Sequence, residues 1–179
     1  MRVSIFKRGI AAILDIYISS VLAHIPILLI YSIETGEVQM TKELSALSTL
    51  NGVLACILGI LIALFYYVIL PVYKFDGQTL MKKTLGFKVV KMDGNNVDLN
   101  TMFKRELLGS MILEGGFVIG GSYLRQLILI IIGSKSLYKG LLYVSFVTTI
   151  LSIIIMIFSK SNRAIHDYIA GTKVLNLKD

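Results

Sequence analysis

The chain has 179 residues, of which 55% are hydrophobic and only 16% are charged, and its mean hydropathy is +0.78. A soluble domain needs more charged surface than this, so the composition excludes an ordinary soluble fold. The net charge is +7, which in a soluble protein would suggest binding to nucleic acid. In so apolar a chain it predicts basic loops that face the anionic inner leaflet of a membrane, and we expect no nucleic acid as a partner.

Residue types used for metal binding, disulfide formation and catalysis are sparse. Cys56 is the only cysteine and lies in an apolar run, while the two histidines, His24 and His166, are far apart in sequence. This pattern provides neither zinc-ligand spacing nor an internal disulfide. The apolar segments also contain no serine–histidine, serine–lysine or metal-ligand pair at suitable spacing. We therefore expect no cofactor, no metal and no enzyme activity.

Four segments are apolar and long enough to suggest membrane helices, because crossing the hydrocarbon takes about 20 residues. The expected spans are about 9–31, 52–73, 115–132 and 137–158. The third is the least regular, since the sequence from 107 to 132 contains Glu114, Arg125 and several glycines. Alternatively, the segment from 107 to 132 begins with a surface helix that ends at about Glu114 and is followed by a shorter span.

The loop charges predict the orientation, because lysine and arginine concentrate on the cytoplasmic side of membrane proteins. The N-terminus, the loop 74–106 and the tail 160–179 are basic, whereas the loop 32–49 carries more acidic than basic residues. We therefore expect one multi-pass domain over 1–179 in the cell membrane, with both termini and the loop 74–106 in the cytoplasm. Termini on the same side require an even number of crossings, which favours four spans.

The cytoplasmic loop is expected to be structured. Residues 87–100 comprise two β-prone runs around an Asp-Gly turn, which is typical of a hairpin, and 172–177 would add a third strand. Residues 101–113 have apolar side chains at helical spacing, with Lys104 and Arg105 on the other side, as in an amphipathic helix on the inner membrane face. The predicted fold class is an all-α membrane protein, a bundle of about four transmembrane helices with a cytoplasmic β-hairpin and an interfacial amphipathic helix.

Asp15 is the main irregularity of the first span, because an ionised aspartate at the membrane centre costs about 2.5–3.5 kcal/mol. Arg8 lies about two helical turns earlier, so both side chains project from about the same face. One interpretation is that Asp15 forms structural hydrogen bonds with a neighbouring helix. The other is a polar site inside the bundle that serves ion or substrate passage.

Glu114 and Arg125 pose the same choice in the third segment. They are about three helical turns apart and so lie on one face of a continuous helix. In one interpretation they line a polar path together with Asp15. In the other, Glu114 simply ends an interfacial helix.

Two further polar clusters lie outside the spans. The stretch 75–90 follows the second span with an Asp-Gly turn and two adjacent lysines, a composition that also suits a basic anchor at a helix end. In the tail 162–175, Arg163 and Asp167 are four residues apart and face the same way on a short helix, with His166 beside them. An exposed ion pair of that kind would contribute little to stability.

Together the polar clusters resemble the RDD family of small multi-span membrane proteins, which is named for one arginine and two aspartates. The first motif is matched by Lys7, Arg8, Ala11 (or Ala12) and Asp15. The loop motif is matched by Gly77, Gln78, Thr79, Lys82 and Gly86. The tail motif is matched by His166, Asp167, Ala170, Gly171, Thr172 and Val174. Met81 departs from the loop motif, because the family usually has glycine at that position.

The resemblance implies that Arg8, Asp15 and Asp167 form the signature trio of the family. With both termini in the cytoplasm, Arg8 and Asp167 would lie at the same level of the inner interface and form an ion pair. Asp15 would then approach Arg8 from about two turns deeper in the membrane. The family is mostly uncharacterised, and membrane transport is the activity often proposed for it.

These features support two functions. The first is a small transporter of ions or small solutes, for instance cations exchanged for protons, because burial raises the pKa of a carboxyl group and allows proton exchange. Four spans are few for a transporter, so a homodimer is expected. The alternative is a structural or accessory protein whose cytoplasmic loop docks a membrane protein partner or the lipid surface.

Overall fold

The computed structural model describes residues 3–37, 44 and 47–177, so part of the predicted outer loop lies outside the described residues. Within the described chain, three helices are long and apolar enough to cross a membrane. They are α1 (Ile5–Thr35), the helix over Thr49–Tyr73 and α7 (Lys135–Phe158). These helices and a small antiparallel sheet confirm the predicted class of an all-α membrane protein with a minor β element.

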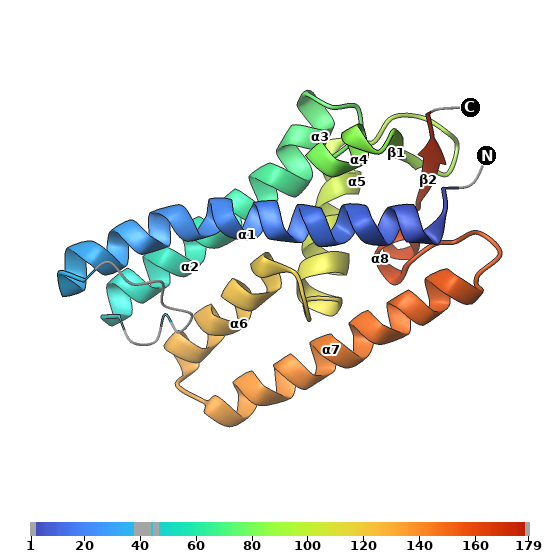
Figure 1. Ribbon diagram of the computed structural model, residues 1–179. Helices are drawn as coiled ribbons and strands as arrows, with labels where there is room; N and C mark the ends of the chain where they lie inside the picture. Colours follow the sequence, from blue (N-terminus) through green and yellow to red (C-terminus); the bar gives the residue numbers. More distant parts are fainter. Residues whose placement is uncertain (1–2, 38–43, 45–46, 178–179) are drawn as a thin grey trace.

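The ends of the helices separate into two sides of the molecule (Figure 1). The start of α1, the end of α7 and the sheet formed by β1 (Phe87–Lys91) and β2 (Thr172–Asn176) lie at one end. The end of α1, the start of α2 (Thr49–Leu64) and the turn from α6 (Ile119–Ile132) to α7 lie at the other. Polar residues near the two ends of the chain can therefore meet on the sheet side.

One stripe of α1 faces the interior of the bundle. Its buried residues recur at every fourth position and are Ala11, Asp15, Ser19, Ala23 and Ile27. The other faces carry large exposed apolar side chains such as Ile25 and Leu29, which suit contact with lipid. The helical period, in which residues four apart share a face, therefore directs Asp15 inward.

The helix that begins with α2 packs closely against its neighbours through small side chains. Its buried residues over this part are Gly52, Ala55, Cys56, Gly59 and Ala63. Small residues let membrane helices approach closely, and a β-carbon on Gly59 would lie 2.4 Å from the Tyr123 ring of α6. The helix then continues through a π-helical turn, η2 (Phe65–Ile69), into α3 (Leu70–Tyr73).

The third predicted span, 115–132, is helical only over α6, whose 14 residues extend about 21 Å. That length is shorter than the hydrocarbon thickness of about 30 Å. The chain reaches α6 from the sheet side through α5 (Leu99–Phe103) and a π-helical segment, η3 (Lys104–Leu113), followed by a break over residues 114–118 (Figure 1). Two helices with a break between them thus replace the continuous span.

The predicted amphipathic helix over 101–113 lies inside the bundle and not on the membrane face. Its second part, η3, contacts α6 and α7, and Arg105 is only 4% exposed. The i→i+5 hydrogen bonds of a π-helix widen each turn, so Arg105, Ser110 and Glu114 are all buried while Leu108 is exposed. A period of 3.6 residues therefore places Met102 and Met111 correctly in the interior but wrongly assigns Arg105 to the exposed side.

The tail strand is the main partner of β1. The two strands pair antiparallel along their whole length, and the predicted hairpin over 87–100 is reduced to one isolated bridge between Val90 and Asn96. The strand that the sequence predicts as a third member thus completes a two-stranded sheet. A short helix, α8 (Ile165–Ile169), precedes β2 and follows the end of α7.

Candidate functional site

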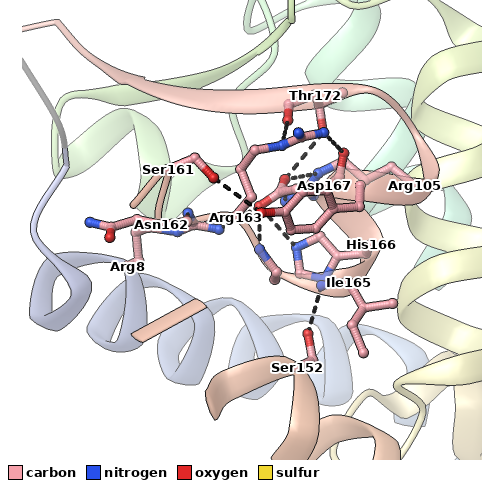
Figure 2. A network of polar contacts seen from close by, with 12 residues as sticks. Arg8, Arg105, Ser152, Ser161, Asn162, Arg163, Ile165, His166, Asp167 and Thr172 are labelled. Carbon is pink, nitrogen blue, oxygen red and sulfur yellow. Dashed lines mark hydrogen bonds and ion pairs between the residues drawn. The ribbon is translucent and has the colours of Figure 1, made fainter. Parts of the chain in front are cut away.

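Asp167, in α8, is the centre of a buried ionic network (Figure 2). Its Oδ2 atom lies 2.8 Å from Nη2 of Arg8, and its Oδ1 atom lies 3.2 Å and 3.1 Å from Nε and Nη2 of Arg105. The backbone N–H of Ala164 and the hydroxyl of Thr172 also donate to this carboxylate, each at 3.1 Å. The Asp167 side chain is 0% exposed. The Asp167 carboxylate therefore joins α1, η3 and the tail of the chain.

The network balances its charges. Arg105 also forms an ion pair with Glu106, and both side chains are buried. Two arginines and two carboxylates thus neutralise one another away from water, as buried charges require. Burial alone would raise the pKa of Asp167, but the charges of Arg105 and its other basic neighbours outweigh burial and hold that pKa well below its usual range.

Asp15 has a separate set of partners. Its carboxylate accepts hydrogen bonds from the hydroxyls of Tyr66 and Thr79 and from the backbone N–H of Met81, the last at 3.2 Å. Asp15 is 1% exposed, and among the described residues no hydrogen bond or ion pair joins it to Arg8. Asp15 therefore contacts the second span and the loop that follows. The prediction that Asp15 approaches Arg8 is wrong.

The loop motif forms the turn that reaches Asp15. Gly77 has a φ of +84°, and a β-carbon there would lie 2.2 Å from the carbonyl oxygen of Val89, so only glycine fits. Gln78 donates to the β1 backbone at 2.9 Å, and Thr79 caps α4 (Leu80–Thr84). The motif therefore presents the Thr79 hydroxyl and the α4 backbone to the carboxylate of α1.

The remaining loop residues have different surroundings. Gly86, with a φ of +69°, connects α4 to β1, and its carbonyl accepts a hydrogen bond of 2.9 Å from Leu177. Met81 contacts Asp15 through its backbone, so the departure from glycine at this position leaves that contact intact. The side chain of Lys82 is partly buried and faces a cavity between the helices.

The tail motif turns the chain from α8 into β2. Gly171 has a φ of +62° and follows Ala170, at the end of α8. Arg163 donates to the backbone carbonyls of Asp167 and Thr172, each at 2.8 Å. The carboxylate of Asp167 is thereby left to Arg8 and Arg105, and the expected pair between the Arg163 and Asp167 side chains is not formed (Figure 2).

Glu114 lies at the break between η3 and α6 and pairs with His166. Its carboxylate oxygens lie 2.7 Å from the backbone nitrogen and 2.8 Å from Nδ1 of His166, and Glu114 is 7% exposed. Thr149 of α7 donates to the Glu114 carbonyl at 2.8 Å. A β-carbon on Gly109 would lie 2.5 Å from Cβ of His166, which shows how closely η3 approaches α8. The break is therefore held against both α7 and α8.

Arg125, in α6, does not join Glu114. Its Nη1 atom donates to the Gly115 carbonyl at 2.8 Å and to the hydroxyl of Ser145 at 3.2 Å. The residue is 5% exposed, and within the described chain its Nε atom has no hydrogen-bond partner. The residues of the expected polar path, Asp15, Glu114 and Arg125, therefore each have separate partners and form no direct contact chain.

A cavity of about 810 Å³ lies between α1 and α7. Ile10 and Ile13 of α1 and Ile153 and Met156 of α7 form apolar walls. The acidic and basic side chains that line it are Arg8, Asp15, Lys82, Arg105, Glu106, Glu114 and His166. Most of the remaining lining residues are apolar, and the other polar ones are Tyr67, Ser110, Thr149 and Ser152. The cavity volume is in the range of ligand-binding pockets, about 300–1,000 Å³.

Sequence reasoning identifies part of this arrangement. The ion pair between Arg8 and Asp167 is confirmed. The third member of that network, Arg105, is missed because the helical period assigns it to an exposed face. Tyr66 is missed because a tyrosine in an apolar span gives no sign of a carboxylate partner; the unsatisfied charge of Asp15 was the only available signal.

The helices, the break between η3 and α6 and the buried ionisable residues together define a small helical membrane protein. The model of the RDD family matches residues 2–171, and the chain belongs to that family. It is 27% identical to the uncharacterized protein YckC of Bacillus subtilis (strain 168) over 164 residues, which cover 92% of this chain and 78% of YckC. No solved structure matches the chain significantly.

Proposed function

We propose that this RDD-family protein is a small transporter of ions or small solutes that uses buried ionisable residues. The cavity between α1 and α7 is the observation that supports this most strongly, because charged side chains line it among membrane-length helices. Ionisable residues at membrane depth commonly mark ion or substrate pathways. The cavity is accordingly the proposed solute site.

The broken helix also favours a transporter. The break over residues 114–118 lies at the cavity, where Glu114, Phe117 and Val118 are among the lining residues. Non-helical backbone at membrane depth is tolerated where it is buried in protein or lines a cavity, and transporters use such breaks at their solute sites. A solute in the cavity would therefore contact both this break and the ionic network.

We further propose a multi-pass arrangement in the cell membrane with the sheet side and both termini in the cytoplasm. Lysine and arginine concentrate in the N-terminus, the loop 74–106 and the tail 160–179, and such loops face the anionic inner leaflet. A homodimer would give the cavity a more complete enclosure than one chain supplies, because α1 and α7 lie apart beside it (Figure 1).

Flux measurements in liposomes test this function. The full chain would be inserted into liposomes of phosphatidylethanolamine and phosphatidylglycerol. Exchange of Na⁺ or K⁺ for protons would be followed through a trapped pH-sensitive dye. Movement of a fluorescent lysophosphatidylglycerol would be followed through quenching from outside. At least one probe should move faster than in liposomes without protein.

Two matched variants connect any flux to the cavity. Ile153→Trp introduces a bulky side chain at a lining position and should abolish the flux. Ile154→Trp makes the same change at the next, exposed residue, which does not line the cavity, and should leave the flux intact. Absence of flux for all probes would contradict a transporter, and stable co-purification of another membrane protein would then favour the accessory role.

A further inference from the structure

The cavity combines two kinds of surface that suit different parts of one ligand. Ile13 and Ile153 on its walls are 69% and 44% exposed, and they belong to helices of membrane-spanning length. Contact with such walls does not stabilise a hydrated inorganic ion. An acyl chain, in contrast, is stabilised there because its apolar surface is removed from water. Charged side chains, among them Arg8, Arg105 and Lys82, also line the cavity. A ligand that matches the whole cavity is therefore apolar along most of its length and polar at one end.

Among the described residues that line the cavity, Lys82 is the cation without a hydrogen-bonded or ion-paired partner. Arg8 and Arg105 both pair with Asp167, and the carboxylates that line the cavity are themselves hydrogen-bonded or paired. In contrast, the ammonium group of Lys82 forms no ion pair or hydrogen bond within the described part of the chain. Burial, and next the charge of Arg105, lower the pKa of Lys82 and outweigh the opposite effect of the nearby carboxylates of Glu106, Asp15 and Asp167. An anion bound beside Lys82 would offset both effects.

We infer that the cavity binds a single-chain amphiphile with an anionic headgroup, which places the headgroup at Lys82 and the chain between α1 and α7. This inference rests on the proposed function, because it assigns a solute class to the same cavity. A lysine ammonium group binds carboxylate or phosphate oxygens as a point charge. The cavity volume of about 810 Å³ suits one chain with a small headgroup.

Photo-crosslinking in liposomes tests the inference. Three probes carry the same chain with a diazirine: a fatty acid, a lysophosphatidylglycerol and a lysophosphatidylcholine, which has no net charge. The first two probes distinguish a carboxylate from a phosphate headgroup. Both anionic probes, or one of them, should label peptides that contain residues 5–16 of α1 and 149–156 of α7. Labelling by lysophosphatidylcholine at equal concentration should be about tenfold weaker.

Substitutions at two adjacent lysines provide the matched control. Lys82→Gln should reduce labelling by the anionic probes about tenfold, the loss of one charge-assisted contact, while Lys82→Arg should retain most of it. Lys83→Gln removes the same charge from an exposed neighbour and should leave labelling unchanged. Gel filtration of each variant would establish that the fold is kept.

Two results would overturn the inference: unchanged labelling in Lys82→Gln, or equal labelling by the probe without net charge. The crosslinking result is independent of transport. Labelling that requires Lys82 in a protein without measurable flux would contradict the proposed transporter and retain the amphiphile as ligand. Flux without labelling that depends on Lys82 would contradict the amphiphile and retain the transporter.

Discussion

Arg8 and Asp167 are 159 positions apart in the sequence, and their side chains meet at 2.8 Å. Arg105 reaches the same carboxylate from the centre of the chain, so one buried aspartate holds three segments together. The side chains of Arg8 and Asp167 are 9% and 0% exposed, which makes an unpaired charge at either position costly. The network is therefore expected to stabilise the sheet side of the bundle as a unit.

Removing the central carboxylate should destabilise the protein strongly. We expect Asp167→Asn to lower the free energy of unfolding by about 3–5 kcal/mol, because it leaves two arginines buried without their shared partner. Denaturant unfolding in detergent micelles measures this change. Asp76→Asn is the control, since Asp76 is exposed and its φ of +47° is one that asparagine adopts readily. Equal losses in both variants would contradict the role of the network.

The contribution of Asp167 should depend on pH in a defined direction. Because folding lowers the pKa of Asp167, its stabilising effect is fully present above the unfolded pKa of about 4 and declines as the pH falls towards the lower folded value. The difference in unfolding free energy between the wild type and Asp167→Asn should stay level from pH 7 to pH 5 and shrink below pH 4. A decline already complete at pH 5 would contradict the lowered pKa.

The close approach of η3 to α8 should make Gly109 intolerant of a side chain. Gly109→Ala places a β-carbon 2.5 Å from Cβ of His166, and we expect a loss of about 1–3 kcal/mol in the free energy of unfolding. Gly140→Ala makes the same change in α7, where a β-carbon has no neighbour within 4 Å, and should be neutral or slightly stabilising. Thermal unfolding of both variants provides the comparison, and a neutral Gly109→Ala would exclude the close contact.

The two adjacent tyrosines of η2 should differ in their contributions. Tyr66 donates to the buried carboxylate of Asp15, whereas the Tyr67 hydroxyl shares a hydrogen bond of 3.1 Å with the hydroxyl of Ser19. A hydrogen bond to a charged group contributes about 1.5–3 kcal/mol and a neutral one about 0.5–1.5 kcal/mol. Tyr66→Phe should therefore lower the unfolding free energy more than Tyr67→Phe. The reverse order would contradict the contact between Tyr66 and Asp15.

Hydropathy and the helical period predict the long spans because both depend on local sequence. They place α1, the helix over Thr49–Tyr73 and α7 within a few residues, and they direct Asp15 to the interior. The region from 99 to 132 could not be predicted in this way, because a π-helical period and a break alter which residues face inward. Partners distant in sequence, such as Arg105 for Asp167, depend on that altered face and so were missed.

A double-mutant cycle between Arg8 and Asp167 tests most directly whether the buried charges are organised around one another. The free energies of unfolding would be measured for Arg8→Met, Asp167→Asn and the double variant. If the two side chains are paired as in the structure, the double variant should lose about 1.5–3 kcal/mol less than the sum of the single variants. Losses that add within about 0.5 kcal/mol would show that the two residues do not interact and would contradict the ionic network.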